Sequence, residues 1–127
     1  MPYLWIALGS AVGGMLRHFV ASGTAKWIES LAGAPQTLAF VGTIFVNVSG
    51  SLAIGAIAAF GPSPLVRQFF MIGLLGGYTT FSSFSLQTLE LAHEGRWLHA
   101  SGNVLLSVVL SIVAVWLGHL CGEALRR

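Results

Sequence analysis

The stretch Gly73-Leu74-Leu75-Gly76-Gly77-Tyr78-Thr79-Thr80-Phe81-Ser82-Ser83-Phe84-Ser85 interrupts a long apolar segment of the chain. Adjacent glycines and a Thr-Thr pair are poor residues for a helix interior, because glycine loses backbone entropy and threonine is crowded at χ1. If this point lies inside a membrane, backbone groups released from the helix must face protein, water or an ion rather than lipid. The stretch therefore predicts a helix broken at mid-membrane, with unwound backbone at Gly76–Thr80, which is how transporters build ion sites.

The composition of the whole chain is typical of an integral membrane protein. Hydrophobic residues make up 55% of the 127 residues and charged residues only 8%, whereas a soluble chain carries roughly 25% charged residues. A helix needs about 20 mostly apolar residues to cross a membrane. The long uncharged stretches predict an all-α membrane protein with one domain, residues 1–127, and four spans. We place these spans at roughly 3–21, 38–60, 65–90 and 97–120.

Few charged residues accompany these spans, and their positions exclude several classes of protein. The net charge is +2, and no basic stripe indicates a nucleic-acid partner. No Asp, Glu or Lys lies near the middle of a predicted span, so the sequence offers no carboxylate for proton coupling. It offers no Cys/His cluster and no Ser/His/Asp set at a shared depth. We therefore expect that the chain is not an enzyme.

The first predicted span combines small residues with one arginine. Gly9 and Gly13 have the G-x-x-x-G spacing that lets two helices approach closely. Arg17 is expected about one turn inside the end of this span. It could extend its guanidinium to the lipid headgroups, or it could form a vestibule that attracts anions. No basic segment precedes the span, so we expect it to be retained, and residues 22–37 to form a polar connection with a short amphipathic piece.

Neutral hydrogen-bonding side chains are the main polar groups expected at membrane depth. Thr43 and Asn47 are four residues apart and lie on one face of the second span. For Asn47, a bond between helices and a pore-lining role are equal alternatives. Asn103, Ser107 and Ser111 are also spaced by four, which predicts a polar stripe along one face of the fourth span.

The broken stretch adds two aromatic rings and a set of backbone carbonyls. The edges of Phe81 and Phe84 carry partial positive charge and can solvate an anion, although core packing is the commoner role of a Phe pair. Hydroxyls and amides without fixed counter-charges suit a small, strongly hydrated anion, because many moderate bonds offset its dehydration. Carbonyls released at Gly76–Thr80 suit a hard cation such as Na⁺.

The basic residues do not favour one orientation in the membrane. With four spans, each side of the membrane receives three of them: Arg67, Arg126 and Arg127 on one side, and Arg17, Lys26 and Arg96 on the other. The positive-inside rule therefore gives no preferred topology. This balance allows a dual-topology, antiparallel homodimer in which two broken stretches meet near the midplane.

The sequence from Gly76 to Ser85 resembles the signature GG-x-TTFS-[ST]-FS of the CrcB/Fluc fluoride channels. The resemblance extends over the whole chain, through Gly13-Gly14-Met15-Leu16-Arg17, Gly42-Thr43 with Asn47, and the serine stripe of the fourth span. It implies a passive fluoride channel in the inner (plasma) membrane, built as a dual-topology homodimer with two pores and a central structural Na⁺.

The resemblance also implies roles for particular residues. Phe81 and Phe84 would be the pore phenylalanines and Asn47 the pore amide. The polar track would include Thr43, Ser83, Ser107 and Ser111, the vestibule Arg17, and the Na⁺ site the backbone carbonyls of Gly76 and Thr79 from both subunits. Two positions depart from the family pattern. Gln87 stands where a Glu is often found, and Asn103, also expected in the pore, stands where some relatives place a Tyr.

Two other functions remain as alternatives. A dual-topology drug exporter of the small multidrug class also has four spans per chain, but it needs a membrane-embedded carboxylate. The acidic residues of this chain are near span ends or in loops: Glu29, Glu90, Glu94 and Glu123. A non-transporting assembly subunit would explain the glycines but would leave the donor stripe without a purpose.

Overall fold

The computed structural model describes residues 1–33 and 38–127, and all regular structure in these ranges is helical. Helix α1 is Pro2–Ala32 and helix α2 is Ala39–Ala59. The third segment consists of α3 (Pro64–Val66), the π-helix η1 (Arg67–Leu75), α4 (Gly76–Tyr78) and α5 (Phe81–His93). Helix α6 is Trp97–Arg126. Four helical segments in the described ranges are long and apolar enough to cross a membrane, which confirms the predicted number of spans.

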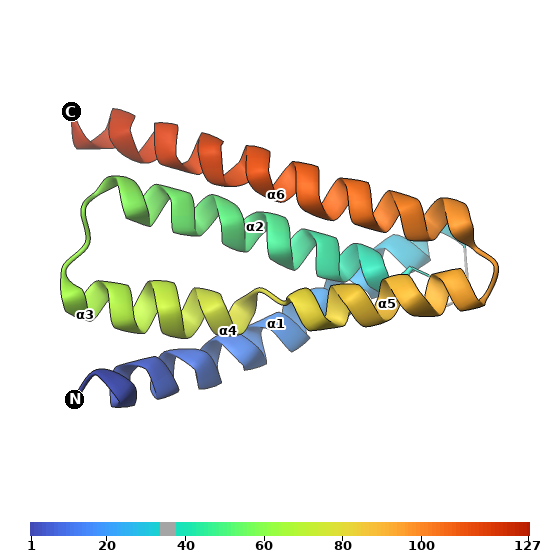
Figure 1. Ribbon diagram of the computed structural model, residues 1–127, viewed down its shortest axis with the longest axis horizontal. Coiled ribbons are helices and arrows are strands. Elements are labelled where there is room, and N and C mark those ends of the chain that lie inside the picture. Colours follow the sequence, from blue (N-terminus) through green and yellow to red (C-terminus); the bar gives the residue numbers. More distant parts are fainter. Residues whose placement is uncertain (34–37) are drawn as a thin grey trace.

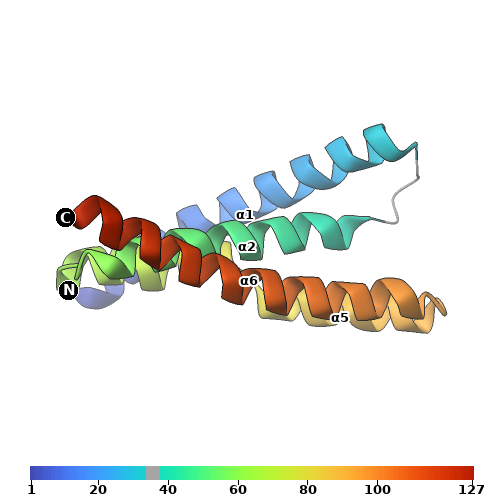
Figure 2. The ribbon, with the colours of Figure 1, turned by 90° about the horizontal axis from the view of Figure 1, so that it is seen from above.

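The four segments run up and down beside one another. Both termini and the turn after α2 lie at one end, and the turn between α5 and α6 lies at the other (Figure 1). Helix α2 packs along α6, while α1 packs against η1, α4 and α2. The second half of α1 diverges from α5 and α6, as Figure 2 shows. The bundle is therefore close-packed around η1 and α4 and more open beside α5.

Close helix contacts depend on residues without a side chain. A Cβ atom on Gly13 would collide with the carbonyl oxygen of Leu74, so α1 and the third segment can approach this closely only at glycine. The same holds between α2 and α6, where a Cβ on Gly55 would collide with the carbonyl oxygen of Val115. The close approach predicted from the G-x-x-x-G spacing of α1 is confirmed.

The turn after α5 has the geometry expected from its glycine. Gly95 has a φ of 73°, in the left-handed region that glycine adopts without strain. The Arg96 N–H donates to the Leu91 carbonyl at 2.9 Å, and the Gly95 N–H donates to the Ala92 carbonyl at 3.0 Å. These two bonds satisfy carbonyls at the helix end and reverse the chain toward α6.

Helix α1 is longer than the sequence indicated. It continues to Ala32, and the chain leaves the helix at Gly33, whose φ is 61°. The prediction of a polar connection is therefore wrong for residues 22–32, and its last part, residues 34–37, lies outside the described residues. An isolated glycine such as Gly23 costs a helix only about 1 kcal/mol and does not end it. Arg17 consequently lies near the middle of α1 and not one turn from its end.

The break in the third segment is confirmed, but it is narrower than predicted. Thr79 has a ψ of 157°, and Thr80 has a φ of −151° and a ψ of 124°, so these two residues are extended. Gly76 and Gly77 remain helical in α4, which corrects the expectation that the unwound backbone begins at Gly76. A Cβ on Gly77 would lie 2.7 Å from the Ser10 carbonyl oxygen. This glycine therefore permits close packing on α1 and does not break the helix.

Much of the outer surface is apolar. On α6 alone, Leu105 is 64% exposed, Ile112 63% and Trp116 61%. Contiguous apolar surface of this kind is rare on a soluble monomer and indicates contact with lipid or with another protein.

Candidate functional site

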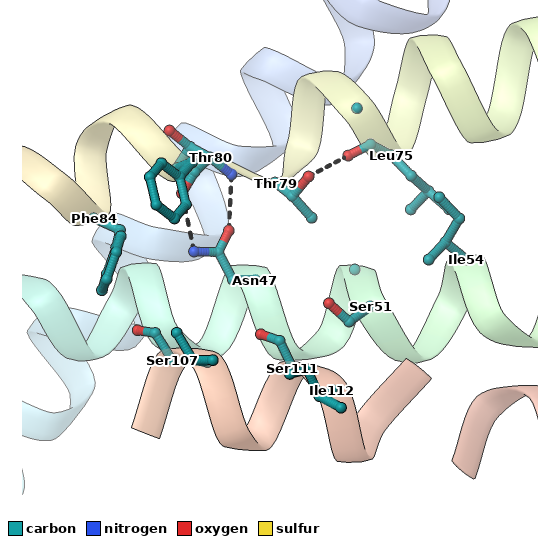
Figure 3. A pocket seen from close by; sticks show the side chains of 14 residues that line it. Asn47, Ser51, Ile54, Leu75, Thr79, Thr80, Phe84, Ser107, Ser111 and Ile112 are labelled. Atoms are coloured by element: carbon teal, nitrogen blue, oxygen red, sulfur yellow. Dashed lines mark hydrogen bonds between the residues drawn. The ribbon is translucent and has the colours of Figure 1, made fainter. Parts of the chain in front are cut away.

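Asn47 holds the two extended residues of the break in place. Its Oδ1 accepts a hydrogen bond from the Thr80 N–H at 2.8 Å, and its Nδ2 donates to the Thr80 carbonyl at 3.0 Å (Figure 3). Thr80 is only 8% exposed, so water cannot easily replace these bonds. An asparagine amide has two N–H donors, and one is used here. The amide thus bonds one helix to another and still has a donor to offer.

Thr80 also starts the helix that follows the break. Its Oγ1 accepts a hydrogen bond from the Ser83 N–H at 3.2 Å and donates to the Ser83 Oγ at 3.2 Å. This is an N-cap, in which a hydroxyl satisfies one of the amides left unpaired in the first helical turn. The positive end of the α5 dipole therefore lies at the break.

These side-chain bonds release two backbone carbonyls. In a continuous helix the Thr80 N–H would bond the Gly76 carbonyl, and the Ser83 N–H would bond the Thr79 carbonyl. Both amides instead bond side chains, namely Asn47 and the Thr80 hydroxyl. The released carbonyls are those expected to bind Na⁺, so the donor set fits a hard cation. The Thr79 carbonyl also lies 3.4 Å from Arg17 Nη1, a contact that competes for one of its lone pairs.

Most of the predicted site residues border one cleft. This cleft has a volume of about 360 Å³ and lies between α2, α4, α5 and α6. The predicted residues on its walls are Asn47, Gly76, Thr79, Phe81, Phe84, Ser107 and Ser111. Figure 3 shows the two serines on α6 and Asn47 on α2. The walls join apolar side chains and neutral hydrogen-bonding groups, and no charged residue of the described chain lines them.

The two phenylalanines differ in their surroundings. Their ring centroids lie 5.1 Å apart, with planes tilted by 52°. Phe84 is only 7% exposed and packs inside the chain, whereas Phe81 is 76% exposed. Core packing within one chain therefore explains why a phenylalanine stands at position 84, but it does not explain the exposed ring of Phe81.

A second pocket contains the remaining residues expected in the polar track and the vestibule. It has a volume of about 250 Å³, and its walls include Arg17, His18, Thr43, Ser83 and Gln87. Thr80 lines both this pocket and the cleft, so the break separates the two. Arg17 turns its guanidinium toward the break, as its contact with Thr79 shows, and does not extend toward the end of α1. It places a positive charge beside a pocket of neutral donors.

Comparison with known proteins identifies the family of the chain. Residues 4–119 match the family described as "CrcB-like protein, Camphor Resistance (CrcB)". The chain belongs to this family. A protein of Rhodospirillum rubrum named "Fluoride-specific ion channel FluC" is 50% identical, over 94% of this chain and 92% of its own length. Proteins with the same name from Methylocella silvestris and Paramagnetospirillum magneticum are 46% and 47% identical, over 100% of this chain and over 97% and 99% of their own lengths. The resemblance to the CrcB/Fluc family and the prediction that the chain is not an enzyme are confirmed.

One predicted pore residue of this CrcB chain, Asn103, lines neither the cleft nor the second pocket. Asn103 is fully buried, with an exposed fraction of 0%. Its Nδ2 donates to Thr88 Oγ1 at 2.9 Å and lies 3.5 Å from the Phe84 carbonyl, and its Oδ1 accepts from Ser107 Oγ at 3.3 Å. Asn103 joins α6 to α5, and only its neighbours in the stripe, Ser107 and Ser111, border the cleft.

Sequence reasoning missed two residues that shape this CrcB site. Thr80 was considered only as part of the unwound backbone, although a threonine three residues before Ser83, at the start of a helix, is an N-cap signal. Thr88 was not singled out, yet its hydroxyl bonds both Asn103 and the Phe84 carbonyl. No local pattern identifies Thr88, because its partner Asn103 lies on another helix.

Proposed function

We propose that the chain is a passive, fluoride-selective channel. The relatives that match it over nearly their whole length are named as fluoride-specific ion channels. The observation that carries the proposal is the cleft itself, in which neutral donors and aromatic rings meet without a carboxylate on the described walls. A small multidrug exporter would need such a carboxylate, and no feature of the cleft favours that alternative.

The proposed pathway replaces the water around fluoride with donors of moderate strength. The hydroxyls of Thr43, Ser83 and Ser111 and the second N–H of Asn47 donate, while the edges of Phe81 and Phe84 add weak positive charge. None of these groups is ionised, so an ion can leave as readily as it enters. Arg17, beside the second pocket, attracts anions from solution. Asn103 lies next to this pathway and contacts it through Ser107.

We further propose that two chains form an antiparallel homodimer in the inner membrane. The cleft lies open on the single chain, and its exposed residues Phe81 and Gly76 are available to a second copy. Gly76 and Thr79 carbonyls from both copies would then hold a Na⁺ at their interface. A bound Na⁺ would supply positive charge that stabilises the facing carbonyl dipoles.

The proposed transport is tested with purified protein in liposomes. Vesicles loaded with potassium fluoride and potassium chloride are diluted into buffer of matched osmolality that lacks both anions and potassium, a potassium ionophore is added so that potassium can follow, and each anion is followed with its own electrode. We expect rapid release of fluoride and retention of chloride, with protein-free vesicles as the control. Equal release of both ions, or release of neither, would contradict the proposal.

The proposed topology is tested by labelling from one side. A cysteine added after Arg127 in a Cys121→Ala background gives a single cysteine at the C-terminus and leaves all six basic residues in place. A membrane-impermeant maleimide should label about half of these cysteines in intact cells, because balanced basic residues allow both orientations. Complete labelling or no labelling would indicate one orientation and exclude the antiparallel dimer.

A further inference from the structure

Two serines of α6 border the cleft, one helical turn apart, but their hydroxyls are in different situations. Ser107 Oγ donates its proton to Asn103 Oδ1 at 3.3 Å. Ser111 Oγ is buried and has no hydrogen-bond partner among the residues that the structure describes. By their spacing along α6 the two serines are equivalent, but their hydrogen bonds differ.

The direction of the Ser107 bond follows from the surroundings of Asn103. The nitrogen side of its amide faces two oxygens, the Thr88 hydroxyl at 2.9 Å and the Phe84 carbonyl at 3.5 Å. Thr88 donates its own proton to the Phe84 carbonyl at 2.8 Å, so its oxygen accepts from Asn103. A reversed amide would place Oδ1 against the Phe84 carbonyl, two acceptors facing each other.

The amide of Asn103 therefore presents its oxygen to Ser107. A carbonyl oxygen only accepts, and a serine hydroxyl has one proton, so that proton is directed away from the cleft. Asn103 is fully buried, so no water competes for the bond. Toward the cleft, Ser107 offers oxygen lone pairs, which repel an anion and accept from water.

We propose that Asn103 is a positioning residue that holds the proton of Ser107 inside the protein, so that Ser111 is the α6 donor that meets an anion in the cleft. The proposal rests on the proposed function and adds a division of labour to it. An anion passes Ser107 with a water molecule between them. At Ser111 it loses a water molecule and accepts a hydrogen bond from the serine hydroxyl instead.

Two single substitutions separate these roles, because each predicts a change in a different measurement. Ser111→Ala removes a donor that has no partner among the described residues, so fluoride efflux should fall about tenfold or more with an unchanged melting temperature. Ser107→Ala leaves a buried Asn103 oxygen unsatisfied, so the melting temperature should fall while efflux per folded protein stays within about twofold. Ser101→Ala, on an exposed serine of the same helix, is the matched control.

A third substitution tests Asn103 directly. Asn103→Leu fills a similar volume, leaves the Thr88 bond to the Phe84 carbonyl intact, and releases the Ser107 proton. In the Ser111→Ala background, it should restore part of the lost fluoride efflux, because Ser107 can then donate into the cleft. Further loss of efflux would show that Asn103 only supports the fold, and it would overturn the proposal. If this variant does not fold, the efflux and melting temperatures of Ser107→Ala and Ser111→Ala test the proposal.

The failures of the two proposals are distinguishable. Equal loss of efflux in Ser107→Ala and Ser111→Ala would overturn the division of labour while the channel itself stands. An unchanged melting temperature in Ser107→Ala would overturn the hold of Asn103 on Ser107. A wild-type chain that releases no fluoride would overturn the proposed function, and with it the role of Ser111.

Discussion

Replacing Asn47 by leucine should destabilise the break in the third span. Asn47 makes two hydrogen bonds to the backbone of Thr80, at 2.8 and 3.0 Å, and Thr80 is only 8% exposed. Leucine has a similar volume but bonds neither group, so a buried N–H and a buried C=O lose their partners. Each unpaired group costs about 1–3 kcal/mol, and the sum is about 2–6 kcal/mol. This is a large part of a typical unfolding free energy of about 5–15 kcal/mol.

The unfolding free energy and the hydrogen exchange of backbone amides are measured for the wild-type protein and its variants in one detergent. Asn47→Leu should lower the unfolding free energy by the stated amount and should speed hydrogen exchange at the Thr80 amide. Ser51→Ala is the matched control, since Ser51 lines the same cleft one turn further along α2. If Asn47→Leu differs from this control by less than about 0.5 kcal/mol, and the Thr80 amide remains protected, Asn47 does not hold the break.

The remaining predictions concern helix packing and the aromatic pair. Gly13→Ala should destabilise the protein by about 1–3 kcal/mol, because the new methyl group would collide with the backbone of the third segment. Gly14→Ala should be neutral or slightly stabilising, because nothing lies within 4 Å of its new methyl group. Similar melting temperatures for these two variants would contradict the packing role of Gly13. Phe81→Ile and Phe84→Ile should both lower fluoride efflux if ring edges solvate the ion, but Phe84→Ile should lower the melting temperature more, because only the Phe84 ring is buried within its own chain. Unchanged efflux in both variants would refute the aromatic role.

The features that could be predicted from the sequence are those that depend on local pattern. Four uncharged apolar stretches predict four spans, and the G-x-x-x-G spacing of α1 predicts close contact with a neighbour. The Thr79–Thr80 pair correctly indicates a break, since β-branched residues fit extended backbone better than a helix.

The features that could not be predicted depend on contacts between helices. The glycines at 76 and 77 favour an unwound backbone by propensity, yet both are helical. Gly77 packs on Ser10 of α1, and tertiary contacts of this kind override propensity. Asn47 finds the Thr80 backbone 33 residues away, and no spacing in the sequence encodes that pair. The spacing by four places Asn103 on the same side of α6 as Ser107. Contacts with α5 bury Asn103, and the sequence of α6 does not reveal them.

Passive movement of fluoride as an ion is the central claim, and its dependence on membrane voltage tests it most directly. Liposomes loaded with potassium fluoride are diluted into fluoride-free buffer, and a potassium ionophore is then added. An uncoupled channel moves net charge, so efflux should stay small until the ionophore lets potassium follow and should then be rapid, with chloride retained in a parallel experiment. Rapid fluoride efflux without the ionophore, or efflux that requires a proton gradient, would contradict a passive channel.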